Sequence, residues 1–180
     1  MGKDDLFRLN PRLIFCSLVG FGQKGRYARK PAYDGIIQGL GGLTGIFDAA
    51  DGQPRFVPMT MADHVVGLIA AKMMLLRLLQ RERTGDGGMV EVPMFETMVS
   101  YVLVEHLWMR GAEPDNGALG YVRMLAPTRR PYPTSDGYIC VLAYTDRHWK
   151  AFFELAGRPE LVDDPRYASI AARTEHIGEL

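Results

Sequence analysis

The chain has 180 residues, and its 21 lysine and arginine residues balance 21 aspartate and glutamate residues, so the formal net charge at pH 7 is zero. This length suits one domain, or one domain with part of another. A balanced charge supplies no field that attracts a polyanion, which argues against nucleic acid or an anionic membrane as a partner. The N-terminus lacks a signal-peptide apolar segment, and Lys72 and Arg77 interrupt the longest apolar stretch, residues 65–79. We therefore expect a cytoplasmic protein.

The first predicted element is a buried strand over residues 12–17, followed by a loop with the spacing Gly20-x-Gly22-x-x-Gly25. In a dinucleotide-binding unit the third glycine opens a helix that meets the pyrophosphate. Here Pro31 stands where the first turns of that helix would run. We interpret the glycines as a mobile loop near a cleft, not as a nucleotide site.

The next predicted elements are a short helix over residues 33–45, weakened by its glycines, and a turn at residues 51–52. Residues 62–83 then form the strongest helical pattern, apolar on most of its circumference, so we expect this helix to be central to a core. Gly85 follows as its C-terminal stop. A strand and a second long helix complete this part, over residues 89–92 and 95–110.

The pattern then breaks into a connector, residues 112–130, between a predicted large domain (1–111) and the start of a small one (131–180). Residues 134–144 predict a turn and strand, and residues 146–157 a helix with Asp146 as N-cap and Gly157 as stop. The last segment begins an amphipathic helix without an evident partner. Both cysteines, Cys16 and Cys140, stand in apolar runs typical of buried reduced thiols.

Catalytic signals are sparse, and neither a serine-hydrolase motif nor a metal-ligand spacing is present. The four histidines are each expected to be packed or on a polar face. Asp63 is the exception, because it opens the apolar helix. By position alone it is more often an acid that satisfies the first amides of its helix. Alternatively, beside the small Gly67, it faces a cleft and serves as a nucleophile.

Several stretches together resemble the class III CoA-transferases, the family that contains formyl-CoA and carnitine-CoA transferases and the related α-methylacyl-CoA racemases. They are NPRLIFCSLVGFGQKGRYARKPAYDGIIQGLGG, RERTGDGGMVEVPMFETM and the segment from RRPYPTSDG to DDPRYASIAAR. The resemblance covers residues 10–180 and implies an α/β fold, with the central part of the family's large domain followed by the start of its small domain. It also implies an interlocked homodimer in the full-length form. Family chains are more than twice as long, so we expect a fragment.

The resemblance places the family's nucleophilic aspartate at Asp63, with Tyr33 and Asp34 facing the cleft and Met94 close to the thioester end of CoA. Acyl-CoA and a carboxylic acid are the implied substrates, with no metal and no tightly bound cofactor. Instead of a glycine-rich lid, the chain has two arginines that either offer charge to an acid or are simply solvated. The remaining CoA- or substrate-binding candidates are Gly41, Gly42, Arg129 and Arg130.

The implied reaction passes CoA from a thioester to a free acid through an aspartyl-CoA intermediate. An acyl-CoA racemase or epimerase is an alternative, but in that branch the position of Tyr33 is a histidine. Tyrosine is a poor base near neutral pH because its pKa is about 10. A second alternative is an inactive fragment that acts as an oligomerising or CoA-binding module.

Overall fold

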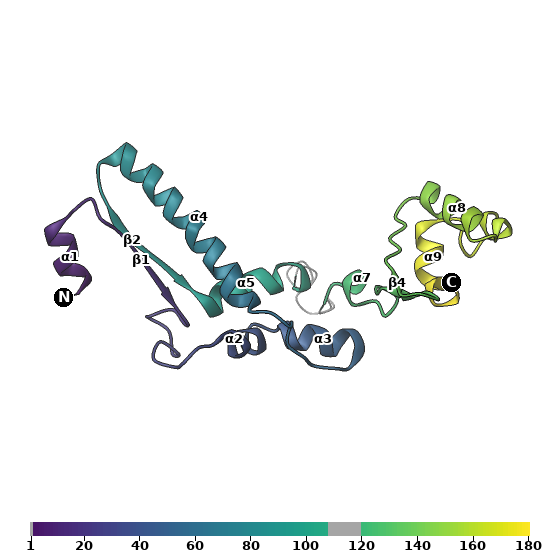
Figure 1. Cartoon of the computed structure of the whole chain (residues 1–180), viewed down its shortest axis with the longest axis horizontal. Coiled ribbons are helices and arrows are strands. Elements are labelled where there is room, and N and C mark those ends of the chain that lie inside the picture. Colours follow the sequence, from purple (N-terminus) through teal and green to yellow (C-terminus); the bar gives the residue numbers. More distant parts are fainter. Residues whose placement is uncertain (1, 108–119) are drawn as a thin grey trace. The chain divides into compact units, whose positions relative to one another are not determined.

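The computed structural model describes residues 2–107 and 120–180, and its chain forms two compact units, Met1–Leu125 and Ala126–Leu180 (Figure 1). The sequence predicted a connector over residues 112–130, of which 112–119 lie outside the described residues. The predicted end of the second long helix at residue 110 lies there as well. The domain limits therefore stay a prediction.

The first unit is a mixed α/β arrangement around one parallel strand pair. Its strands are β1 (Ile14–Val19) and β2 (Gly88–Pro93), with Ile14 opposite Gly88 and Val19 opposite Pro93. In Figure 1 the long helix α4 runs along this pair. The helices are α1 (Lys3–Leu9), α2 (Asp34–Leu40), α3 (Leu43–Asp51), α4 (Met61–Thr84), α5 (Met94–His106) and α7 (Val122–Leu125).

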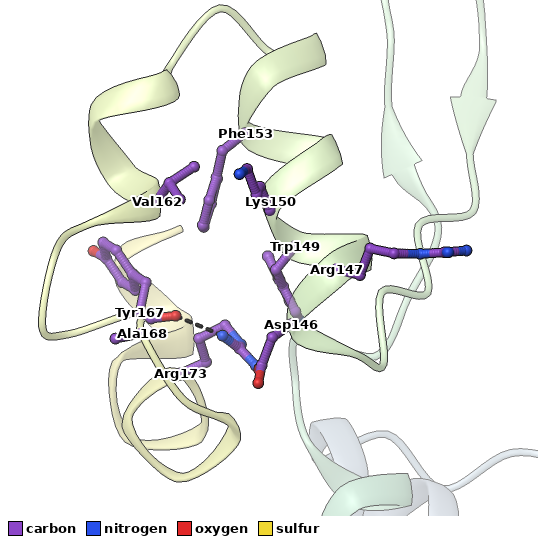
Figure 2. Close-up of a pocket in the computed structure, with 9 residues that line it drawn as sticks. All are labelled: Asp146, Arg147, Trp149, Lys150, Phe153, Val162, Tyr167, Ala168 and Arg173. Carbon is purple, nitrogen blue, oxygen red and sulfur yellow. Dashed lines mark hydrogen bonds and ion pairs between the residues drawn. The ribbon is translucent and has the colours of Figure 1, made fainter.

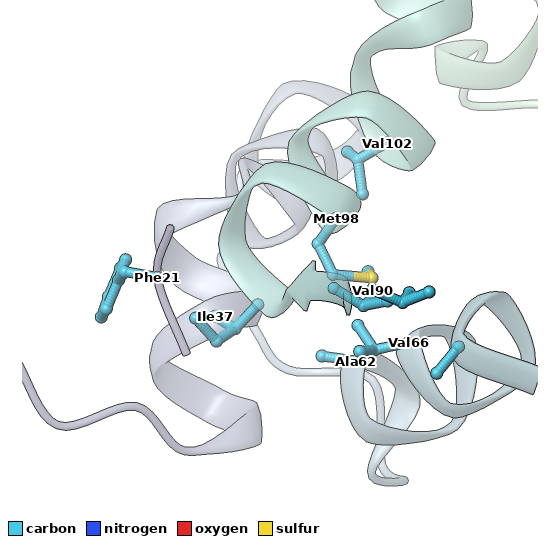
Figure 3. Close-up of a cluster of buried hydrophobic side chains, with 9 residues drawn as sticks. Phe21, Ile37, Ala62, Val66, Val90, Met98 and Val102 are labelled. Atoms are coloured by element: carbon cyan, nitrogen blue, oxygen red, sulfur yellow. The ribbon is translucent and has the colours of Figure 1, made fainter. Parts of the chain in front are cut away.

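The core of this unit lies where α2, α4, α5 and β2 meet. Figure 3 shows Ala62, Val66, Val90 and Met98 gathered there. β1 is only half-buried, and the prediction of a buried strand was wrong, because the described residues pair it with a single neighbour. The buried apolar side chains of the cluster are Phe21, Ile37, Ala62, Val66, Ala70, Val90, Val92, Met98 and Val102.

Helix α4 has nearly the predicted bounds, and Gly85 ends it in the left-handed conformation with φ of 84°. The expectation that it is central to the core is confirmed, because α4 contributes Ala62, Val66 and Ala70 to the buried cluster and contacts α2, α5 and both strands, but its buried face is narrower than its apolar face. Only Ala62, Val66 and Ala70 are buried, four residues apart, so a single narrow stripe of the helix packs on the unit. Its leucines face outward, with Leu68 74% exposed, because no described element covers that face.

The predicted helix over residues 33–45 is two helices, because the helical conformation is interrupted at Gly41 and Gly42. Gly42 has a φ of 91°, which side chains disfavour. A Cβ at Gly41 would lie 2.8 Å from the carbonyl oxygen of Ile37 and 3.5 Å from the Cβ of Met98, so α5 packs closely here. Residues 48–51 belong to α3, and the predicted turn is reduced to Gly52 as its C-cap.

The second unit packs α8 (Asp146–Leu155) against η1 (Pro159–Val162) and contains a small antiparallel strand pair. The predicted strand over 134–144 is only two residues long, which leaves Cys140 exposed, and Cys16 is half-buried, so the prediction of two buried thiols was wrong. The remaining elements are β3 (Tyr132–Pro133), β4 (Tyr138–Ile139), α9 (Ile170–His176) and η2 (Ile177–Glu179).

Two predictions about these helices need correction. The N-cap of α8 is Thr145, whose hydroxyl accepts a hydrogen bond from the amide of His148, and Asp146 is the first helical residue. The last helix has a partner: the buried Arg173 of α9 donates to the Asp146 carboxylate and to the carbonyl of Tyr167 (Figure 2). Gly157 has the positive φ expected of a helix stop. None of the described helices is both long and apolar enough to cross a bilayer.

Candidate functional site

Asp63 lies in the first turn of α4 with its side chain exposed. Among the described residues, no hydrogen bond or ion pair involves its carboxylate, so this side chain does not cap its own helix. Gly67 follows four residues later on the same face, and a Cβ there would meet nothing within 4 Å. The Asp63 carboxylate therefore stands free beside an open stretch of helix surface.

Asp34 supplies the cap that Asp63 does not. Its Oδ2 accepts hydrogen bonds from the amide of Ala62 at 2.7 Å and from the amide of Asp63 at 3.2 Å. These amides belong to the first turn of α4 and lack partners within their own helix. The first turn of α2, where Asp34 lies, is thus joined directly to the first turn of α4.

Gln38 is a site residue that sequence reasoning missed. It is 1% exposed, and its Nε2 donates to Asp34 Oδ1 at 2.5 Å and to the carbonyl of Met59 at 3.2 Å. Its Oε1 accepts from the amide of Val57 at 2.9 Å. The available signal was its spacing: it follows Asp34 by four residues in an apolar helix, which places both side chains on one face.

Tyr33 and Met94 flank this arrangement differently. Tyr33 is the N-cap residue of α2, precedes Asp34 directly and is 73% exposed. Met94 is the first residue of α5 and packs, partly buried, against the core. The structure therefore brings Tyr33, Asp34 and Asp63 to the joined starts of α2 and α4. Contact of any of them with a substrate stays a prediction.

The other predicted binding residues lie elsewhere. Gly41 and Gly42 form the junction of α2 and α3, at the opposite end of α2 from Asp34. Arg129 and Arg130 belong to the second unit, where both are exposed, and their amides donate to the carbonyls of Ala126 and Thr128. Their roles in binding stay predictions.

The glycine loop after β1 makes hydrogen bonds to two acidic side chains, and the expectation that it is mobile stays a prediction. The amide of Gly22 donates to Glu96 Oε1 at 2.9 Å, and the amide of Gln23 donates to Glu91 Oε1 at 3.2 Å. No helix begins at Gly25, where the chain continues in turns. Because carboxylates occupy these amides, the loop does not offer the phosphate cradle of a dinucleotide site.

The described residues contain no group of histidine, cysteine, aspartate and glutamate side chains arranged to hold a metal ion. His106 is buried, and its Nδ1 accepts a hydrogen bond from the amide of Tyr121 at 3.1 Å, which is the packed role expected of a histidine. His64 and His148 are exposed.

Comparison with known proteins gives consistent results. A family model described as CoA-transferase family III matches residues 1–180. A probable fatty acyl-CoA transferase from Mycobacterium tuberculosis is 30% identical over 190 residues, which span 100% of this chain and 48% of the relative. The crystal structure of that mycobacterial protein matches with a TM-score of 0.81, over 99% of this chain and 47% of the other. Succinyl-CoA–D-citramalate CoA-transferase from Chloroflexus aurantiacus is 31% identical, over 100% and 45% of the two chains. The chain thus spans about half the length of the curated relatives it matches.

Proposed function

The chain belongs to CoA-transferase family III, and on that premise we propose that it transfers CoA from an acyl-CoA thioester to a free carboxylic acid, with Asp63 as the nucleophile. The observation that carries the proposal is the free carboxylate of Asp63, which is exposed while Asp34 satisfies the amides around it. A carboxylate that serves only to cap a helix would hold those amides itself. The Chloroflexus aurantiacus relative, named as a succinyl-CoA–D-citramalate CoA-transferase, supports this class of reaction.

The proposed chemistry begins with attack of an Asp63 carboxylate oxygen on the thioester carbonyl carbon. The carbon–sulfur bond breaks, giving a mixed anhydride and CoA thiolate. The thiolate then attacks the carbonyl carbon of Asp63, so that the donor acid leaves as its carboxylate and an aspartyl-CoA thioester remains. An acceptor carboxylate reverses both steps and departs as the new acyl-CoA. Each attack forms an oxyanion that needs hydrogen-bond donors.

The other residues take supporting roles in this proposal. Tyr33 and Met94 line the reacting end of CoA, and Asp34 borders the cleft. Gly41 and Gly42 offer close backbone approach, and Arg129 and Arg130, in the second unit, stay candidates for binding an acid. The homodimer implied by the family resemblance and the cytoplasmic location expected from the sequence belong to the same proposal. Racemisation is disfavoured because Tyr33 replaces the proton-moving histidine.

The test is the intact mass of the chain after incubation with a panel of acyl-CoA thioesters, followed by peptide mapping. We expect an acyl or CoA adduct confined to the peptide that contains Asp63, and none in Asp63→Ala. Asp86→Ala is the matched control, because Asp86 is another exposed acid, in the turn after α4. A folded wild-type chain without an adduct would refute the transferase proposal for this chain and favour the inactive binding module. Exchange of the α-proton without an acceptor acid would favour the racemase.

A further inference from the structure

We propose that Gln38 is a positioning residue for Asp63, acting through Asp34 on the backbone at the start of α4. This inference rests on the proposed function. Gln38 lies one helical turn beyond Asp34, and no direct hydrogen bond joins Gln38 to Asp63 among the described residues. Its influence therefore has to pass through the Asp34 carboxylate and through the chain segment that leads into α4.

The orientation of the Gln38 side chain is determined by its partners. Both hydrogens of Nε2 face acceptors, at Asp34 Oδ1 and at the carbonyl of Met59, while Oε1 faces the amide of Val57. If the side-chain amide were reversed, Nε2 would face the donating amide of Val57, and Oε1 would face the two acceptor oxygens of Asp34 and Met59. Because the group is 1% exposed, water cannot replace a lost partner, so the side chain has one satisfactory arrangement.

This arrangement fixes the carboxylate of Asp34. Gln38 holds one oxygen at 2.5 Å, which leaves the other directed at the amides of Ala62 and Asp63. Gln38 also holds the segment before α4, through Val57 and Met59. The backbone that carries the Asp63 side chain is therefore held from two sides.

The same contacts explain why the Asp63 carboxylate is free. An acid in the first turn of a helix is attracted to the unpaired amides and to the positive end of the helix dipole. Here the Asp34 carboxylate already accepts hydrogen bonds from those amides, and its negative charge compensates the positive end of the helix dipole. If Asp34 rotated away, Asp63 could fold back onto its own helix. Gln38 prevents that rotation, and so keeps Asp63 extended towards the thioester.

The experiment compares Gln38→Met with the wild-type chain in single-turnover formation of the Asp63 adduct. We expect the rate to fall at least about tenfold, because small displacements of a reacting group are costly. The acyl-CoA concentration that gives half-maximal rate should stay within about twofold, since Gln38 is not proposed to touch the substrate. Ile36→Ala, on the exposed side of the same helix, is the control and should leave the rate unchanged. Gln38→Glu, which keeps the acceptor for Val57 and loses both donors, is the second variant if Gln38→Met does not fold.

Two readouts separate positioning from a general loss of packing. Amide hydrogen exchange at Ala62 and Asp63 should accelerate in the Gln38 variant, whether or not the chain is active. In a double-mutant cycle with Asp34→Ala, the combined slowing should be smaller than the sum of the two separate effects, because part of the effect of Gln38 passes through the Asp34 carboxylate. Unchanged exchange or additive effects would overturn the inference while the transferase proposal stood. A wild-type chain without an adduct would refute the transferase proposal. Hydrogen exchange at Ala62 and Asp63 would still test whether Gln38 holds the start of α4 through Asp34.

Discussion

The carboxylate of Asp34 accepts a hydrogen bond from the backbone amide of Asp63, 29 residues further along the chain, at 3.2 Å. Two acidic residues thus meet at one helix start, but only one of them uses the helix amides. Asp34 acts as the cap, and Asp63 is left without a partner among the described residues. This division of roles is what distinguishes Asp63 from an ordinary first-turn acid.

Removal of the Asp34 carboxylate should destabilise the first unit. Asp34→Ala leaves the amides of Ala62 and Asp63 without an acceptor and removes one acceptor of the buried Gln38 amide, so it should lower the free energy of unfolding by about 1–3 kcal/mol. Asp34→Asn keeps an acceptor oxygen and should cost less. Urea unfolding followed by circular dichroism measures both. Asp48→Ala, at an exposed acid of α3, is the control. An equal loss of stability in that variant would show that Asp34 does not stabilise the unit by capping α4.

The second prediction compares Gly42, the N-cap residue of α3, with Gly45, which lies inside that helix. Gly42→Ala forces a side chain onto a φ of 91° and should destabilise the chain by about 1–2 kcal/mol. Gly45→Ala lies inside α3, where φ is not positive and an added Cβ meets nothing within 4 Å, so it should stabilise by about 0.4–1 kcal/mol. Chemical denaturation of both variants checks the contrast, and the same sign for both would contradict the split of α2 from α3.

Asp164 provides a pH-dependent prediction in the second unit. The Arg166 guanidinium donates to its carboxylate and lowers the pKa of Asp164 below the ordinary value of 3.8. Since the folded pKa is depressed, the pair stabilises the unit above pH 3.8, and this contribution is lost as the pH falls through the folded pKa. A carboxyl-carbon NMR titration should show the low pKa, and Arg166→Gln should raise it. Arg158→Gln, which removes the partner of Glu160 instead, should leave the Asp164 titration unchanged.

The sequence was informative about α4 because local signals decide its limits. Apolar periodicity predicted its length, Gly85 predicted its end, and Asp63 was placed in its first turn. The exposure of Leu68 was not predictable, since periodicity states that a side chain is apolar but not which element covers it. Gln38 was missed for a related reason. Its role depends on Val57 and Met59, which fold back onto α2 from about 20 residues away, and no local pattern encodes that contact.

The last prediction concerns the buried cation of the second unit. Arg173 is 3% exposed and donates to the carbonyl of Tyr167 and to the Asp146 carboxylate, while its Nε has no partner among the described residues. Asp146→Ala removes the only carboxylate paired with this guanidinium within the described part of the chain. Because the Asp146 side chain is 73% exposed to water, we expect the free energy of unfolding to fall by about 1–3 kcal/mol, which is less than the cost of breaking a fully buried pair.

Arg173→Met tests the same pair from the other side. It removes the buried charge together with its desolvation cost and leaves Asp146 exposed to water, so it should cost less than Asp146→Ala despite deleting more hydrogen bonds. Urea unfolding, monitored by the fluorescence of Trp149 next to Arg173, measures both variants. A larger loss for Arg173→Met would mean that the bond to the Tyr167 carbonyl outweighs the ion pair. In that case α9 is held chiefly through the backbone of the segment that precedes it, and the charge of Asp146 is secondary.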